Sequence, residues 1–265
     1  MRVWVEGVGL CGPGLNGWQA SRPLLSGTAE YRSAPTVSPA SELLPATERR
    51  RVGAPVKLAL ASGQEAFANA GRDAAATATV FASSSGDGAN VHQLCETLAS
   101  PERDVSPTRF HNSVHNAAAG YWSIAIGARA PSTSLCCHDA SFAAGMLETA
   151  AQVAADGSPV ALVACDHPYP APLDAVRPMC ASFGVALVLT PQPTERAFAE
   201  LDVEFVAQPA VPTRMSDAGL EAVRTGVPAG RSLPLLAALA RGASETVVLD
   251  YAWGTHLRVG TAPWK

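Results

Sequence analysis

The sequence predicts an α/β protein in which strands and helices alternate and pack in layers. Two observations support this prediction. Val160–Ala164 and Val185–Leu189 are short, wholly apolar runs, as expected for central strands covered on both faces. Longer segments of helical composition, such as Ser141–Ala155, alternate with such runs. Alternation of this kind favours layers of helices packed against a sheet.

Turn and stop residues place the other elements of the N-terminal part. Val3–Val8 leads into the turn Gly12-Pro13-Gly14 and predicts a first strand. Val56–Ala70 has a mostly apolar face and is followed by Gly71, which predicts a helix that ends there. The remaining expectations are an extended loop at Ser33–Pro45, a strand that runs into Ser83–Gly88, helices at Val91–Ala99 and Asn116–Ile126, and a strand at Ser132–Cys137.

The tail from Pro191 is less regular and rich in proline. It predicts one helix, Leu233–Ala240, and two strands, Thr246–Tyr251 and His256–Val259. We find no repeat and no second-domain boundary, so residues 1–190 and 191–265 are expected to pack together as one domain.

Composition excludes several classes of protein. The 265 residues are 48% hydrophobic and 16% charged, which favours a large core over disorder. The net charge is −4, and the only dense basic stretch is Glu48–Arg51, so we expect no nucleic-acid partner. The N-terminal segment resembles a strand rather than a signal peptide, and no apolar run approaches the roughly 20 residues of a membrane span.

The six cysteines are scattered, and none forms a CxxC pair. A disulfide framework or a structural zinc site is therefore not expected, and we predict no metal and no cofactor. Reduced thiols in apolar surroundings are typical of a cytoplasmic protein.

The stretch STSLCCHDASFAAG places two thiols, a histidine and an aspartate where a predicted strand becomes a helix. The positive end of a helix favours a thiolate, so Cys136 or Cys137 is a candidate nucleophile with His138 or Asp139 as its base. On a strand, however, adjacent side chains point to opposite faces, so adjacency in sequence makes no catalytic pair. Cysteine is also a common small core residue, and both interpretations stay open.

Other polar clusters carry weaker signals. His111 and His115 have the spacing of a metal pair on a helix, but their segment is expected to be a loop without a third ligand. Hydrogen bonds from these histidines and from Asn112 and Asn116 that hold the loop are the simpler interpretation. Ser83–Gly88 lacks the spacing and the lysine of a phosphate-binding loop.

Three stretches together resemble the β-ketoacyl synthases of the thiolase fold. They are SPTRFHNSVHNAAAGYWSIAIGARAPS, STSLCCHDASFAAGMLETAAQVAADG and VALVACDHP. The second resembles the nucleophile strand, its elbow and the buried helix behind it. The resemblance implies a thiolase-like layered α/β fold, with a ketosynthase-like N-terminal half at residues 1–190 that is essentially complete and a C-terminal half truncated to residues 191–265.

Two departures from this family bear on function. Counting from Pro131 places Asp139 in the nucleophile position, whereas counting back from Gly145 places Cys137 there, and the usual flanking residues are replaced. Condensation also needs two downstream histidines, or a histidine and an asparagine, to stabilise the carbanion. After Pro191 the chain has a single histidine, His256.

A condensing-enzyme scaffold without its catalytic set resembles a chain-length factor, in particular those of bacterial aryl polyene pathways. The resemblance implies a non-catalytic subunit that forms a heterodimer with a full-length ketosynthase, meets an acyl carrier protein transiently and limits chain length. It places residues 110–140 at the subunit interface and acyl tunnel; the residues concerned are Phe110, His111, Asn112, His115, Asn116, Tyr121 and Trp122.

Three alternatives remain. The aromatic residues of this set could equally fill the core of the monomer. The chain could be an active acyl-transferring enzyme that uses Cys137, or a homodimeric acyl-binding scaffold.

Overall fold

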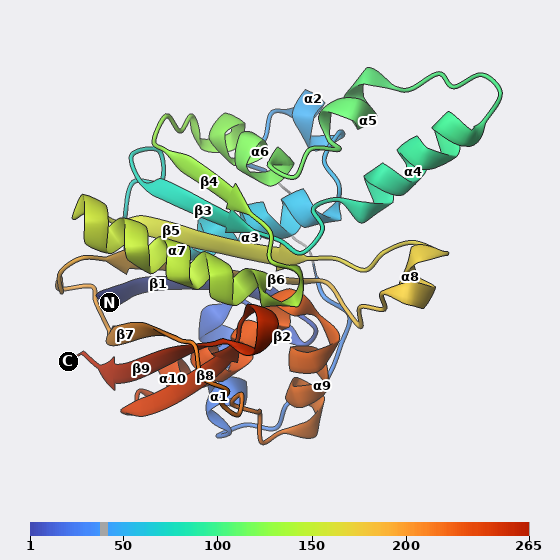
Figure 1. The fold of residues 1–265 in the computed structure, drawn as a ribbon. Coiled ribbons are helices and arrows are strands. Elements are labelled where there is room, and N and C mark those ends of the chain that lie inside the picture. The colour runs from blue at the N-terminus through green and yellow to red at the C-terminus, as the bar shows by residue number, and fades with distance from the viewer. Residues whose placement is uncertain (38–41, 265) are drawn as a thin grey trace.

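One twisted mixed sheet organises the computed structural model, which describes residues 1–37 and 42–264 (Figure 1). Within these residues the sheet has nine strands in the order β4-β3-β5-β6-β1-β7-β9-β8, and β2 pairs with β1. β3 is parallel to β4 and β5, and the other neighbours are antiparallel. The strands are β1 (Arg2–Gly12), β2 (Leu15–Asn16), β3 (Ala78–Ala82), β4 (Ser132–Leu135), β5 (Val160–Asp166), β6 (Phe183–Thr190), β7 (Ala199–Val206), β8 (Glu245–Asp250) and β9 (His256–Pro263).

Helices cover both faces of this sheet. The α-helices are α1 (Trp18–Ser26), α2 (Ala46–Arg49), α3 (Ala54–Ala70), α4 (Gly88–Ala99), α5 (Pro107–His111), α6 (Ala117–Ile126), α7 (Ser141–Asp156), α8 (Leu173–Val176), α9 (Ala218–Gly226) and α10 (Leu233–Arg241). Short 3₁₀ helices are η1 (His138–Ala140), η2 (Pro228–Ser232) and η3 (Ala252–Gly254). None of the helices in the described part of the chain is long and apolar enough to cross a membrane.

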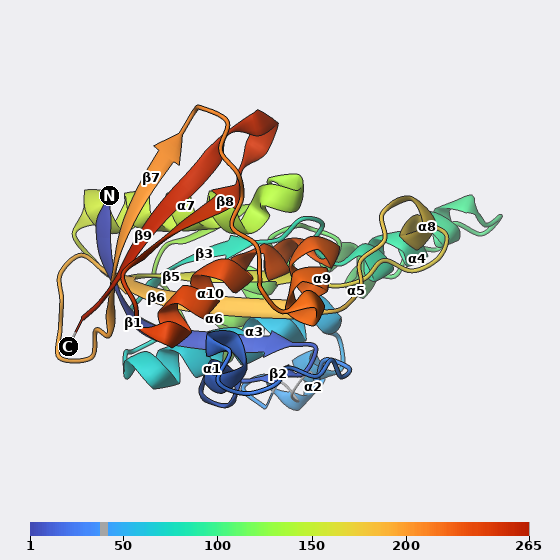
Figure 2. The ribbon, with the colours of Figure 1, turned by 90° about the horizontal axis from the view of Figure 1, so that it is seen from below.

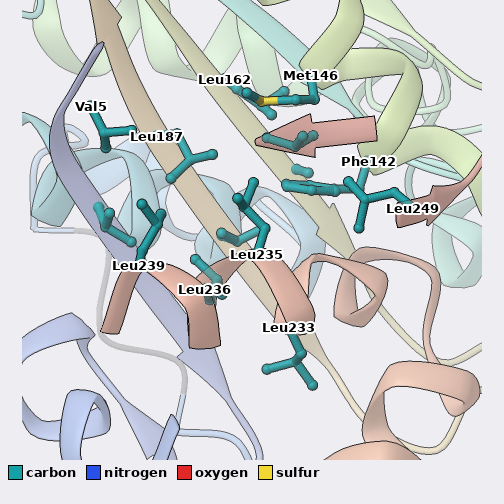
Figure 3. Packing of buried hydrophobic residues seen from close by; sticks show 14 of the residues in the cluster. Val5, Phe142, Met146, Leu162, Leu187, Leu233, Leu235, Leu236, Leu239 and Leu249 are labelled. Carbon is teal, nitrogen blue, oxygen red and sulfur yellow. The ribbon is translucent and has the colours of Figure 1, made fainter. Parts of the chain in front are cut away.

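The layers follow from where apolar side chains can be buried. α3 and α6 share one hydrophobic cluster on one face of the sheet. α7 and α10 lie against the opposite face, and the last three strands fan away from the rest and cover them (Figure 2). In this second cluster Phe142 and Met146 of α7 and Leu235 of α10 pack with Leu187 of β6 and Leu249 of β8 (Figure 3). The predicted α/β layered fold is thereby confirmed.

The three C-terminal strands have one apolar and one polar face. In β7, Leu201 and Val203 are buried, whereas Asp202 between them and Glu204 after them are exposed. Alternation of this kind is typical of an antiparallel sheet with one solvated face. The outer face of this part of the sheet therefore needs no further helices to cover it.

Most of the predicted elements are present within a few residues of their expected ends. The expectation of an irregular tail is wrong, because the tail also contains β7 and α9. The helix α1, near the N-terminus, is a further element that the sequence patterns do not predict. The N-terminus of α1 has no capping side chain of its own, and the N–H of Trp18 instead donates to Glu65 Oε1 of α3 at 2.5 Å. A cap so distant in sequence leaves no local signal. The loop expected at 33–45 lies partly outside the described residues, which omit 38–41.

The closest packing in the fold joins α3 to β1. A Cβ atom on Gly9 would lie 1.9 Å from the carbonyl oxygen of Ser62, and one on Gly7 would lie 2.1 Å from that of Ala66. The helix backbone thus rests directly on the strand. At this short separation Glu65 Oε2 also accepts a hydrogen bond from the Leu10 N–H at 2.8 Å.

Gly9→Ala is therefore expected to destabilise the protein by roughly 3 kcal/mol, because helix and strand backbones must move apart to admit the methyl group. Thermal unfolding monitored by circular dichroism measures the effect. Gly260→Ala in β9 is the matched control, since its Cβ would meet nothing closer than Asp202 Cβ at 3.7 Å. Equal melting temperatures for the two variants would contradict the proposed role of the Gly9 contact.

Candidate functional site

The cysteine-containing segment lies at the carboxyl edge of the parallel strands. β4 ends at Leu135, Cys136 and Cys137 follow, and η1 leads into α7. The segment that joins β4 to α7 is a sharp strand-to-helix turn, which we call the elbow and define as residues 136–140. Strand-to-helix turns of this type hold nucleophiles in several enzyme folds because they expose a single side chain.

His138 occupies the strained position of the elbow. Its φ is +48°, one of three positive values among non-glycine residues in the described part of the chain. Its ring is exposed and contacts the guanidinium of Arg177, and its Nδ1 lies 3.5 Å from Asp139 Oδ1. Among the described residues no hydrogen bond joins His138 to either cysteine, so the elbow contains no thiol–imidazole pair of the kind that activates a nucleophile.

Among the described residues, neither thiol of the elbow is hydrogen-bonded to a base. Burial raises the pKa of the Cys137 thiol above its ordinary value, and the neighbouring Cys136 raises it further. The Cys137 N–H donates to Ser141 Oγ at 3.0 Å, and the Ser141 hydroxyl donates to the His138 carbonyl at 2.7 Å. The Cys136 thiol is exposed and donates to the Ser84 carbonyl at 3.4 Å. The expected lowering of a thiol pKa at the helix start is therefore wrong for Cys137.

Asp139 is held between two guanidinium groups. Its Oδ1 accepts from Arg177 at 2.8 Å and its Oδ2 accepts from Arg231 at 3.1 Å. Arg231 also reaches Asp250 at 3.3 Å, so the ion pairs extend from the elbow to the end of β8. A carboxylate that is paired on both oxygens is held in place and is not free to turn toward a thiol. No local sequence signal points to either arginine, because they lie 38 and 92 positions from Asp139.

A groove of about 520 Å³ opens in front of the elbow. Residues 136–140 form one wall, and Arg231 with residues 251–253 forms the other. Trp253, at the tip between β8 and β9, is 97% exposed and has a φ of +54°. Sequence analysis did not single out this tryptophan.

A second cavity lies behind the loop that follows β3. Phe81 and Ala82 of β3, Val56 of α3, and Val114 and His115 contribute to its mostly apolar lining. Its free volume is only about 20 Å³, which is room for about one water molecule. This cavity is therefore too small to hold an acyl chain within the isolated protein.

Asp166 is a buried carboxylate at the carboxyl end of β5. It is 1% exposed, and its Oδ1 accepts hydrogen bonds from the Ser84 N–H at 2.8 Å and the Ser84 hydroxyl at 2.7 Å. The Ser83 hydroxyl lies 3.3 Å from the same oxygen, and the Ala229 N–H donates to Oδ2 at 2.9 Å. Burial raises the pKa of Asp166 to about 6, although these four donors oppose the shift. No local sequence signal distinguishes this residue.

The aromatic residues of the predicted interface separate into two groups. Phe110 is 68% exposed on α5, whereas Tyr121 and Trp122 are 2% and 1% exposed within the chain. Trp122 stacks on Phe67 with ring centroids 5.5 Å apart. Tyr121 and Trp122 thus fill the monomer core, so that among these aromatic residues an interface role stays a prediction for Phe110.

The polar residues of the same segment separate in a similar way. Asn112 is buried, donates to the Arg51 carbonyl at 2.8 Å and accepts from the Tyr121 hydroxyl at 2.9 Å. His115 Nε2 lies 3.0 Å from the Ser83 carbonyl. These two residues hold the loop through hydrogen bonds, as expected, whereas His111 and Asn116 are exposed. Within residues 1–37 and 42–264, no three His, Cys, Asp or Glu side chains are grouped to hold a metal ion.

Comparison with known proteins relates this geometry to a family. A family model described as the β-ketoacyl synthase N-terminal domain matches residues 21–249. No curated protein matches the chain.

Several solved structures share the fold. One is a ketosynthase in complex with its chain length factor from Xenorhabdus doucetiae, at 21% identity over 98% of this chain and 99% of that chain, with a TM-score of 0.73. The ishigamide ketosynthase/chain length factor matches at 15% identity over 100% of both chains, with a TM-score of 0.74. A type II polyketide acyl-carrier protein in complex with its ketosynthase bound to the hexaketide matches at 12% identity over 99% of both chains, with a TM-score of 0.74. At these identities the likeness establishes a thiolase-like ketosynthase fold.

The raised pKa of Asp166 makes stability depend on pH. Its folded pKa of about 6 lies above the ordinary value of 3.8, so between these pH values the folded state binds more protons than the unfolded state. The free energy of unfolding should therefore fall as pH rises from about 4 to 6, by about 3 kcal/mol in total from this group. Urea denaturation of wild type and Asp166→Asn between pH 4 and 7 isolates the contribution, because other titrating groups cancel in the difference. Parallel pH curves for the two proteins would contradict this assignment.

Proposed function

The chain belongs to the family of β-ketoacyl synthase N-terminal domains, and from this premise we propose that it is the non-catalytic partner of a full-length β-ketoacyl synthase. In this role it acts as a chain-length factor in polyene or polyketide-type assembly, of which aryl polyene synthesis is the example we favour. The observation that carries the proposal is the chemistry of the elbow. Its strained position is occupied by His138, whose ring contacts Arg177, and its thiols lack a base.

The elbow chemistry argues against covalent catalysis by this chain alone. Transfer of an acyl group to an enzyme needs a thiolate or a thiol with an adjacent base. The pKa of Cys137 is raised instead of lowered, and Asp139 is paired with Arg177 and Arg231. A chain that retains the elbow but not its chemistry is suited to shape a site that another subunit completes.

The free edge of the sheet supports the heterodimer. Among residues 1–37 and 42–264, β4 is an end strand, and the carbonyls of Pro131 and Leu135 accept hydrogen bonds from the β3 side. Because backbone groups alternate along a strand, those of Ser132 and Ser134 face away from β3. An unpaired edge of this kind is a template for a strand of another subunit, and the exposed Phe110 of α5 offers an aromatic anchor for a partner.

The opposite edge of the sheet is blocked. On β8, the Thr213 N–H donates to the Val248 carbonyl and the Val248 N–H donates to Thr213 Oγ1, each at 2.9 Å. Partner pairing is therefore proposed at β4 and not at β8.

The acyl tunnel in this proposal runs between the subunits. The apolar cavity of this chain has a free volume of only about 20 Å³, whereas the groove at the elbow is open to solvent. A growing chain would be enclosed only when the synthase subunit covers these surfaces. The acyl carrier protein would deliver chains to the synthase, as the hexaketide-bound neighbour in complex with a carrier protein suggests.

The two parts of the chain divide the proposed role. Residues 1–190 form the ketosynthase-like half with the elbow and the free β4 edge, and residues 191–265 form the reduced C-terminal half that packs on it. All six cysteines are unpaired, which fits a reducing cytoplasmic setting.

Ser134→Pro tests the proposed interface. Proline removes an N–H that faces the free edge and leaves the ladder with β3 intact, so the fold should persist while affinity for the synthase falls about tenfold or more. The measurement is co-purification with the synthase of the same pathway, followed by a binding titration. Thr246→Pro on β8 is the control, because Thr246 lies two residues before Val248 and its N–H faces the other, blocked edge of the sheet.

Full retention of binding by Ser134→Pro would show that β4 is not the contact. A wild-type chain that stays monomeric in the presence of the synthase would contradict the proposed function itself.

Incubation with an acyl thioester tests the absence of covalent catalysis. We expect mass spectrometry to find no acyl adduct on this chain, because neither thiol has a base. In the complex with the synthase, Cys137→Ala should give the same product yield as wild type. An adduct on Cys137, with product formation lost in Cys137→Ala, would identify the chain as an active acyl-transferring enzyme instead.

A further inference from the structure

Asp166 joins three segments that are distant in sequence. It ends β5, its Oδ1 binds Ser83 and Ser84 of the loop after β3, and its Oδ2 binds Ala229 of η2. A carboxylate that is 1% exposed and satisfied by four donors is held in one orientation.

The two serines that bind Asp166 also contact residues that line the elbow groove or the apolar cavity. The Ser84 carbonyl accepts the Cys136 thiol at the start of the elbow, at 3.4 Å. The Ser83 carbonyl meets His115 Nε2 at 3.0 Å, and both residues line the apolar cavity.

The third partner of Asp166, Ala229, lies near the ion pairs of Asp139 with Arg177 and Arg231, which we call the Asp139 clamp. Ala229 lies on the same 3₁₀ helix as Arg231, which binds Asp139 Oδ2 at 3.1 Å. The carboxylate of Asp166 therefore lies behind both the elbow groove and the apolar cavity and touches neither opening.

We propose that Asp166 is a positioning residue that fixes the elbow relative to the loop after β3 and to η2, and so sets the shape of the surfaces that enclose the acyl chain. The consequence for chain length rests on the proposed function. The positioning itself does not, because it depends only on contacts within this chain.

The chemistry of Asp166 predicts what substitution would do. Asparagine has nearly the same size but offers one acceptor and one donor group. Because the Ser84 N–H and the Ala229 N–H both donate to the carboxylate, one of them must face the amide NH₂ in Asp166→Asn. Either the loop after β3 or η2 must then shift. Ser84→Ala removes one hydroxyl donor and retains the backbone contact, whereas Ser84→Thr retains both.

The test is the rate at which iodoacetamide labels Cys136 relative to Cys95, resolved by peptide mass spectrometry on the isolated chain. Cys95 is an exposed thiol on α4 and serves as the internal reference. Asp166→Asn should raise the Cys136/Cys95 ratio about fivefold, because the contact between Cys136 and Ser84 is released. Ser84→Ala should raise it less, and Ser84→Thr should leave it at the wild-type value. If Asp166→Asn does not fold, the two Ser84 variants still decide the question.

An unchanged ratio in folded Asp166→Asn and in Ser84→Ala would overturn the inference and leave the proposed function standing. The second readout is the chain-length distribution made by the synthase together with each variant, which should shift for Asp166→Asn and stay the same for Ser84→Thr. A raised ratio with an unchanged distribution would support the positioning role and count against the chain-length role.

Discussion

The contact of α3 with β1 is the constraint on which the rest of the structure depends. Gly7 and Gly9 admit the helix backbone to the strand, and this separation lets Glu65 accept hydrogen bonds from the N–H groups of Leu10 and Trp18. Glu65 therefore fixes both the end of β1 and the start of α1, which in turn packs against α10. At the other end of α3 the Pro55 carbonyl accepts the Cys165 thiol, next to Asp166. One helix–strand contact thus sets the distance between the central sheet and the residues behind the elbow.

The strained turn at the elbow is enforced by the elements that it joins. A left-handed backbone at a non-glycine residue costs free energy and persists only where its surroundings enforce it. Here α7 packs tightly behind the turn: a Cβ on Gly145 would lie 2.6 Å from Leu162 Cδ1 and 2.9 Å from Ala82 Cβ. β4 is likewise held in place by its pairing with β3. The segment between β4 and α7 must therefore turn sharply, whichever residue occupies the bend. His138 accordingly adopts φ +48°, and the ion pairs of Asp139 with Arg177 and Arg231 stabilise the same conformation.

Sequence reasoning succeeded where the signal is local. Apolar runs and glycine stops identified the central strands and the helices α3, α7 and α10. It failed where the partner of a residue lies far along the chain, as with the Asp139 clamp and the Glu65 cap of α1. The helix α6 illustrates a different failure: AAAGYWSIAI is apolar on nearly every face, so periodicity could not decide whether Tyr121 and Trp122 face the core or a partner. The missed strand β7 was readable, because AELDVEFV alternates apolar and polar residues.

The two edges of the sheet indicate where a partner subunit would bind. Blocking of β8 by Thr213 leaves β4 as the free end, and β4 leads directly into the elbow. A subunit that pairs with β4 would therefore come to lie beside the elbow and the apolar cavity, the surfaces that Asp166 holds in place. Because that cavity is too small for an acyl chain by itself, the length of an enclosed chain would depend on how far the walls of the two subunits stand apart. In this arrangement, buried residues that fix the walls would influence product length alongside residues that touch the acyl chain.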